Sequence, residues 1–147
     1  NTGMYDRILV PVDGGPGTER VIDEALELAT LTGAELHALS VIDTRDYGTL
    51  PEATWLTIRE EFEREAEQAL TTVKTAVGER APLTTATERG VPHEAILAYA
   101  TEEGCDCIVM GTHGRSGLDR VLLGSVTERV IRHATVPALV VHIDGDD

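Results

Sequence analysis

The sequence predicts an α/β fold in which five parallel strands form one doubly wound open sheet with helices on both faces. Two observations predict it. Short aliphatic and β-branched runs alternate along the chain with segments whose apolar residues recur at helical spacing. Glycine-rich loops follow the first and fourth of these runs. Parallel strands joined in this way need right-handed crossovers, which place helices on both sides of the sheet.

The first half of the chain alternates strand, helix, strand and helix. Residues 6–12 (DRILVPV) are a β-branched run that breaks into a glycine-rich turn, which predicts a strand followed by a loop. Thr18 can cap the next segment, where apolar residues recur at helical spacing until a glycine stops it. The apolar run 36–42 predicts the second strand. Pro51 suits the first turn of a long helix that continues to Val77 with one apolar stripe.

The second half repeats the alternation. Residues 83–88 are a weaker strand whose threonines fit an edge position. Pro92 leads into a helix, and the run 105–110 (CDCIVM) predicts the fourth strand. A glycine-rich loop then precedes a helix expected over 124–133, and the run 138–143 (ALVVHI) supplies the fifth strand. In such sheets ligands bind beyond the carboxyl ends of the strands, so the loops after the first and fourth strands are the predicted location of the site.

The length fits one domain. We expect it to cover residues 4–147, since no linker or repeat interrupts the 147 residues. The three residues before Met4 are expected to be a remnant of recombinant expression outside the fold. Cys105 and Cys107 lie two residues apart in a predicted strand. We expect them to share one face of it as buried, reduced thiols that cannot bridge each other without distortion.

The charge of the chain excludes two classes of partner. The 26 acidic residues outnumber the 12 basic ones, which gives a formal net charge of -14. Such a surface repels nucleic acid and anionic lipid, so we expect no nucleic-acid partner. Apolar stretches stay shorter than the roughly 20 residues of a membrane-spanning helix, and the amino terminus does not have the pattern of a signal peptide. The expected location is therefore cytoplasmic.

The loop after the fourth predicted strand has a spacing that suits phosphate binding. Gly111, Gly114 and Gly124, followed by Ser125, form the pattern G-x2-G-x9-G-S. Glycines let backbone amides approach phosphate oxygens closely, and the helix that begins nearby offers unpaired N–H groups and a positive dipole end. The hydroxyls of Ser125 and Thr127 can add donors.

Three segments carry most of the motifs, namely ILVPVDGG at 8–15, GVPHEAI at 90–96 and CDCIVMGTHGRSGLDRVLLGSVTERVIRHATVPALVV at 105–141. Together they resemble the universal stress protein family, in the subgroup that binds ATP. The resemblance covers nearly the whole chain. It implies a parallel sheet of five strands in the order 3-2-1-4-5 with four helices, ATP as ligand, Mg²⁺ as an ion that the phosphates could hold, and a homodimer paired through the carboxyl-terminal strand.

The resemblance also implies site residues. Beyond the first two strands they would be Pro11 and Val12 beside adenine and ribose, Asp13 on the sugar, and a backbone contact to adenine from Val41. The implied phosphate loop consists of Gly111, His113, Gly114, Arg115, Gly124, Ser125, Val126 and Thr127. Two other roles for the Asp13 carboxylate remain open, namely help in holding a divalent cation or capping of its own turn. The family often has a serine where this chain has Gly15.

Several functions remain to be compared. The preferred one is an ATP-binding stress-response protein that acts as a homodimeric sensor or regulatory module. The alternatives are a slow ATPase or an enzyme that adenylates a substrate, and a structural stress dimer that does not use nucleotide. A Walker-type loop is excluded because Lys74, the single lysine, follows a valine inside a predicted helix. Metal-ligand spacing among the five histidines is absent, so we expect no zinc site.

The basic residues give one hint about the source of the chain. Eleven of the 12 are arginines, because Lys74 is the single lysine. An acidic sequence almost empty of lysine resembles cytoplasmic proteins of salt-accumulating halophiles, in which concentrated cations screen mutual repulsion. An acidic protein from a GC-rich genome is the other interpretation.

Overall fold

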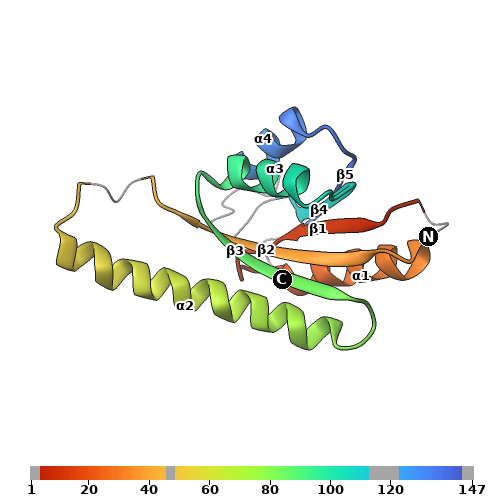
Figure 1. The fold of residues 1–147 in the computed structure, drawn as a ribbon, viewed down its shortest axis with the longest axis horizontal. Coiled ribbons are helices and arrows are strands. Elements are labelled where there is room, and N and C mark those ends of the chain that lie inside the picture. Colours follow the sequence, from red (N-terminus) through yellow and green to blue (C-terminus); the bar gives the residue numbers. More distant parts are fainter. Residues whose placement is uncertain (1–3, 46–48, 113–122, 144–147) are drawn as a thin grey trace.

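Five parallel strands form one sheet in the order β3-β2-β1-β4-β5 (Figure 1). The computed structural model describes residues 4–45, 49–112 and 123–143. The strands are β1 Arg7–Pro11, β2 Glu35–Asp43, β3 Leu83–Gly90, β4 Cys107–Gly111 and β5 Ala138–Val141. The predicted fold class and strand order are confirmed.

Four helices cover the two faces of this sheet. They are α1 Thr18–Thr32, α2 Glu52–Val77, α3 Pro92–Glu102 and α4 Ser125–His133. Figure 1 shows α1 and α2 on one face and α3 and α4 on the other. In the part of the chain that the structure describes, none of these helices combines the length and the apolarity needed to cross a lipid bilayer.

The strand at the centre of the sheet is buried on both sides. Ile8, Leu9 and Val10 of β1 are at most 2% exposed. Because successive side chains of a strand point to opposite faces, Ile8 and Val10 join the core under α1 and α2, whereas Leu9 joins the core under α3 and α4. This explains why the run has no polar alternation, as is typical of a parallel strand covered by helices.

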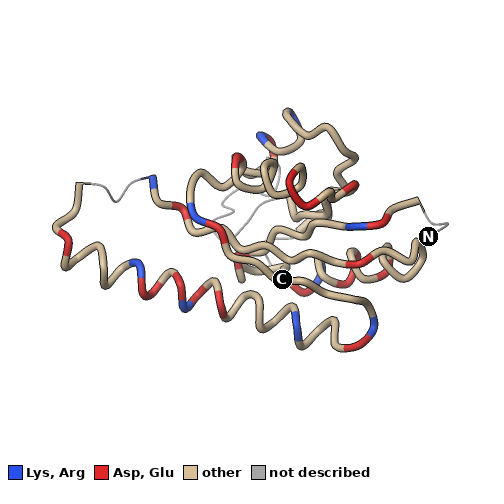
Figure 2. Tube along the Cα trace, viewed as in Figure 1, with Lys and Arg blue, Asp and Glu red and all other residues tan. Residues whose placement is uncertain are grey.

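Only the second half of helix α2 packs its buried residues against the sheet (Figure 1). Its buried residues all lie in its second half, namely Ala66, Ala69, Leu70, Val73 and Val77. The first half extends past the sheet in Figure 1. Acidic residues outnumber basic ones along the whole of α2 (Figure 2). Arg59 and Glu63 form an ion pair of 3.5 Å one turn apart, and Arg89 of β3 also pairs with Glu63.

The two cysteines correct one expectation from the sequence. Strand β4 begins at Cys107, and Asp106 before it accepts hydrogen bonds from the backbone N–H groups of Asp6 and Arg7. Cys105 therefore precedes the strand and packs in the core under α3 and α4, whereas Cys107 packs under α1 and α2. The prediction that they share a face is wrong. Both are buried free thiols, and burial raises the pKa of Cys105 to about 11.

Candidate functional site

The strand order reverses at β1, which pairs with β2 on one side and β4 on the other. Leu9 of β1 lies opposite Ile108 of β4, so the two strands end close together. The carboxyl ends of parallel strands at such a reversal are the usual place for a ligand in open α/β sheets. The two loops identified from the sequence both start at this edge, one after Pro11 and the other after Gly111.

The loop after β1 places a carboxylate at this edge. Val12 is buried, and its backbone N–H donates to Leu39 of β2 at 2.9 Å. Asp13 is exposed, and its Oδ1 accepts a hydrogen bond of 2.9 Å from the backbone N–H of Gly15. The carboxylate thus caps its own turn, as one of the open interpretations of the sequence has it. This bond fixes the Asp13 side chain beside the end of the strand.

The same loop ends in a glycine that the sequence analysis did not single out. Gly17 is the N-cap of α1 and has a φ of 86° and a ψ of -1°, a left-handed conformation that favours glycine. Thr18 is already the first residue of the helix. Its hydroxyl donates back to the carbonyl of Gly15 at 2.7 Å, so the prediction that Thr18 caps the helix is wrong.

The second loop ends at the beginning of α4. Gly124 is the N-cap, and its backbone N–H donates to the carbonyl of Thr112 at 2.8 Å. The first hydrogen bond within the helix runs from the N–H of Glu128 to the carbonyl of Gly124 at 2.9 Å. The amides of Ser125 and Val126 therefore belong to the opening turn, where N–H groups have no partner within the helix. The side chain of Ser125 is exposed.

Thr127 has a different role from the hydroxyl donor that the sequence suggests. Its side chain is 3% exposed, and its hydroxyl donates to the carbonyl of Gly111 at 2.8 Å. This bond ties α4 to the end of β4. Thr127 thus faces the sheet, and what it can offer a ligand is its backbone N–H.

The remaining predicted site residues divide into two groups. Val41 of β2 lies two residues beyond Leu39, the partner of Pro11, and is partly buried against the core under α3 and α4. The structure thus brings the ends of β1, β2 and β4 to one edge. His113, Gly114 and Arg115 lie outside the described residues.

Near the end of β2 a positive charge is already paired. Arg45 donates to both carboxylate oxygens of Asp43, with distances of 2.9 Å from Nε to Oδ1 and 2.5 Å from an Nη to Oδ2. The hydrogen bonds from Arg45 lower the pKa of Asp43. The charge of Arg45 is therefore balanced locally.

Thr112 is a residue of this edge that sequence reasoning missed. Its backbone N–H donates to the carbonyl of Val141 at 2.9 Å, and its Oγ1 accepts from the backbone N–H of Ile143 at 3.1 Å. Together with the bond from Gly124, these contacts join the end of β4 to the end of β5, to Ile143 beyond it and to the beginning of α4. A hydroxyl residue directly after Gly111 is the one signal that the sequence offers for this role.

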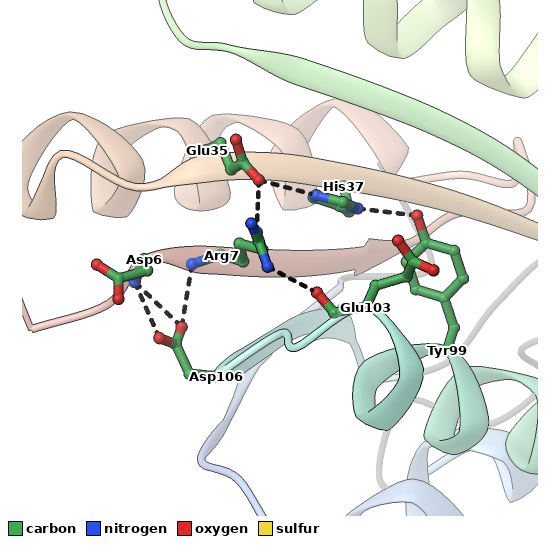
Figure 3. Close-up of polar contacts among 7 residues, drawn as sticks. All are labelled: Asp6, Arg7, Glu35, His37, Tyr99, Glu103 and Asp106. Carbon is green, nitrogen blue, oxygen red and sulfur yellow. Dashed lines mark hydrogen bonds and ion pairs between the residues drawn. The ribbon is translucent and has the colours of Figure 1, made fainter.

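A second polar cluster lies at the opposite, amino-terminal edge of the sheet (Figure 3). Glu35 accepts hydrogen bonds from Arg7 at 2.7 Å and from Nε2 of His37 at 3.2 Å, and Nδ1 of His37 lies 2.8 Å from the hydroxyl of Tyr99. The bonds from Arg7 and His37 lower the pKa of Glu35, and burial raises the pKa of Tyr99. A second nitrogen of Arg7 donates to the carbonyl of Glu103. These contacts tie α3 to β1 and β2.

Metal-ligating residues do not gather in the described ranges. Within residues 4–45, 49–112 and 123–143, no group of three or more His, Cys, Asp or Glu side chains could hold a metal ion. Among the residues that the structure describes, the carboxyl edge offers the backbone N–H groups at the start of α4 and the carboxylate of Asp13.

Comparisons with known proteins agree with this architecture. The universal stress protein MJ0531 of Methanocaldococcus jannaschii is 39% identical over 140 residues, which cover 94% of this chain and 82% of that protein. The solved structure of MJ0577 from the same organism has a TM-score of 0.82 and 34% identity, and the match covers 94% of this chain and 96% of that one.

A third relative was solved with a ligand. The universal stress protein from Archaeoglobus fulgidus in complex with dAMP has a TM-score of 0.68 and 26% identity, and the match covers 93% of this chain and 98% of that one. The model of the universal stress protein family matches residues 4–142. Because this match spans nearly the whole sheet and its helices, the chain belongs to the universal stress protein family.

Proposed function

We propose that this protein binds an adenine nucleotide, ATP, at the carboxyl edge of β1 and β4 and acts as a sensor or regulatory module. The observation that carries the proposal is the position of the first turn of α4. Gly124 fixes that turn to the end of β4 through Thr112, and the Asp13 carboxylate lies beyond the neighbouring strand. The relative that was solved with dAMP supports the adenine nucleotide class.

The first turn of α4 suits the phosphates. The amides of Ser125 and Val126 lie at the positive end of the helix dipole, and Gly124 before them has no side chain that could cover them. Hydrogen bonds from backbone N–H groups to an anion are charge-assisted and therefore stronger than those to a neutral acceptor. In the proposed site Gly111, His113, Gly114 and Arg115 belong to the same phosphate loop.

The sugar and the base would lie toward β1 and β2. A carboxylate accepts about four hydrogen bonds, so the bond from Gly15 leaves acceptor capacity on Asp13 for ribose hydroxyls. Pro11, Val12 and Val41 would line the base. The buried side chain of Val12 and its hydrogen-bonded N–H leave its carbonyl as the group that could contact a base. Mg²⁺, if it accompanies ATP, would be held through the phosphates.

We prefer binding to turnover for a physical reason. Tight binding of ATP does not accelerate its cleavage unless the transition state is held more strongly than the substrate. A bound nucleotide instead stabilises the folded state and shifts the population of loop conformations, which is what a regulatory ligand in the cytoplasm requires.

Calorimetry tests the proposal directly. Protein stripped of nucleotide is expected to bind ATP at least tenfold more tightly than GTP, because the main chain of β1 and β2 would contact the base. The bound nucleotide is analysed after the titration: intact ATP supports a regulatory role, whereas AMP with pyrophosphate indicates the adenylating alternative. If ATP gives neither heat nor a shift of the unfolding temperature, the proposal is wrong.

We also propose that the protein is a homodimer paired through β5. This strand lies at the end of the sheet order and pairs with β4 on one side, and Leu139 on it is 41% exposed. An exposed apolar edge strand is a ready template for pairing with a second chain about a two-fold axis. Light scattering is expected to give twice the chain mass of 15.8 kDa. The variant Leu139→Lys is expected to give the monomer mass, whereas a monomeric original protein would contradict the pairing.

A further inference from the structure

The residues that follow β5 contact both loops of the candidate site. On one side Thr112 donates its backbone N–H to the carbonyl of Val141, the last residue of β5, and its Oγ1 accepts the N–H of Ile143, which follows the strand. The carbonyl of Thr112 accepts from Gly124, the N-cap of α4. One residue thus fixes both the segment after β5 and the start of the proposed phosphate-binding turn.

On the other side the same segment covers the loop after β1. The side chain of Ile143 is 4% exposed and packs on Gly17, the N-cap of α1. A Cβ atom at Gly17 would lie 2.7 Å from Cγ2 of Ile143, so the two residues are in close contact. Ile143 therefore bridges the end of the loop after β1 and the residue at which the loop after β4 begins.

We propose that Thr112 and Ile143 are positioning residues that set the separation of the two loops and couple nucleotide binding to the segment after β5. The inference rests on the proposed function. Neither residue needs to touch the nucleotide. They hold Gly17, at the end of the loop after β1, and Thr112 and Gly124, at the end of β4 and the start of α4, in one arrangement. Because coupling between two sites is reciprocal, a bound nucleotide must in turn hold Ile143 and the end of β5 more firmly.

The bond from Ile143 to Thr112 is the part of this arrangement that a single substitution can remove. Thr112→Val keeps the shape of the side chain but removes the oxygen, which leaves the N–H of Ile143 without this acceptor. The loss of a partner for a buried donor is costly. Thr112→Ser keeps the oxygen. Thr101→Val is the matched control, because the Thr101 hydroxyl donates to Leu97 within α3, away from both loops.

Two measurements on the full chain test the inference. Calorimetry gives the ATP affinity of each variant, and hydrogen exchange of the peptide that contains residues 138–143 is compared with and without ATP. Thr112→Val is expected to bind ATP about tenfold more weakly, with little ATP-dependent slowing of exchange. Thr112→Ser and Thr101→Val are expected to stay within about twofold of the original affinity and to keep the slowing.

The outcomes separate this inference from the proposed function. If the original protein binds ATP and the Thr112→Val variant binds it equally well, the inference is wrong and the proposed function stands. The inference is also wrong, and the proposed function stands, if the original protein binds ATP but ATP leaves the hydrogen exchange of residues 138–143 unchanged. This result does not depend on whether any variant folds. If the original protein does not bind ATP, both are overturned.

Discussion

Replacing Gly124 with valine is expected to weaken ATP binding at least a hundredfold, equal to a loss of about 2.7 kcal/mol, while the fold remains. Gly124 has a φ of -64° and a ψ of 154°, which any residue can adopt, and its backbone bond to Thr112 survives the change. The new side chain would lie at the first turn of α4, where phosphate oxygens would approach the amides in the proposed site. Calorimetry measures the affinity, and circular dichroism checks the fold.

Ser125→Ala is the matched comparison for this variant. It removes an exposed hydroxyl but keeps the backbone N–H of the same turn, so the ATP affinity should change by less than about fivefold. A hundredfold loss in Ser125→Ala would mean that side chains and not main-chain amides hold the phosphates. Unchanged affinity in Gly124→Val would place the phosphates elsewhere.

Replacing Gly17 with alanine is expected to lower the free energy of unfolding by about 2 to 4 kcal/mol. Two costs add. A φ of 86° is unfavourable for a residue with a Cβ, and that Cβ would lie within 2.9 Å of three side-chain atoms of the buried Ile143. Urea denaturation measures the difference between the variant and the original protein.

Gly33→Ala separates the two costs. Gly33 ends α1 with a φ of 76° and a ψ of 17°, close to the conformation of Gly17, but it is exposed. Its substitution is expected to cost about 1 kcal/mol from backbone conformation alone. Equal losses of stability in the two variants would show that the contact between Gly17 and Ile143 contributes nothing.

Most of the fold could be predicted because burial on both faces leaves a clear sequence pattern. The apolar runs around Leu9 and Ile108 mark central strands, and their alternation with amphipathic segments determines the crossovers. Strand ends were less predictable. Cys105 belongs to an apolar run, yet the carboxylate of Asp106 bonds backbone groups of the neighbouring strand, so β4 starts only after it.

Less of the candidate site could be predicted, because its contacts join distant residues. The spacing of Gly111 and Gly124 predicted a phosphate-binding loop, which stays a prediction, and the structure places Gly124 at the start of a helix. The bond between Thr112 and Ile143 spans 31 residues and has no local pattern. The hydroxyl of Thr127 was predicted as a donor to the ligand, because its real acceptor, the carbonyl of Gly111, lies 16 residues away in the sequence. This bond holds α4 against the end of β4.

The main-chain donors at the start of α4 have a consequence for ionic strength. At 1 M salt, charges separated by more than about 3 Å are largely screened, so a ligand held by the long-range attraction of lysines and arginines is released. Fixed amides bind through short contacts that screening does not remove. In a chain with a net charge of -14, salt also weakens the repulsion of an anionic ligand. A site built in this way retains its ligand in a concentrated electrolyte.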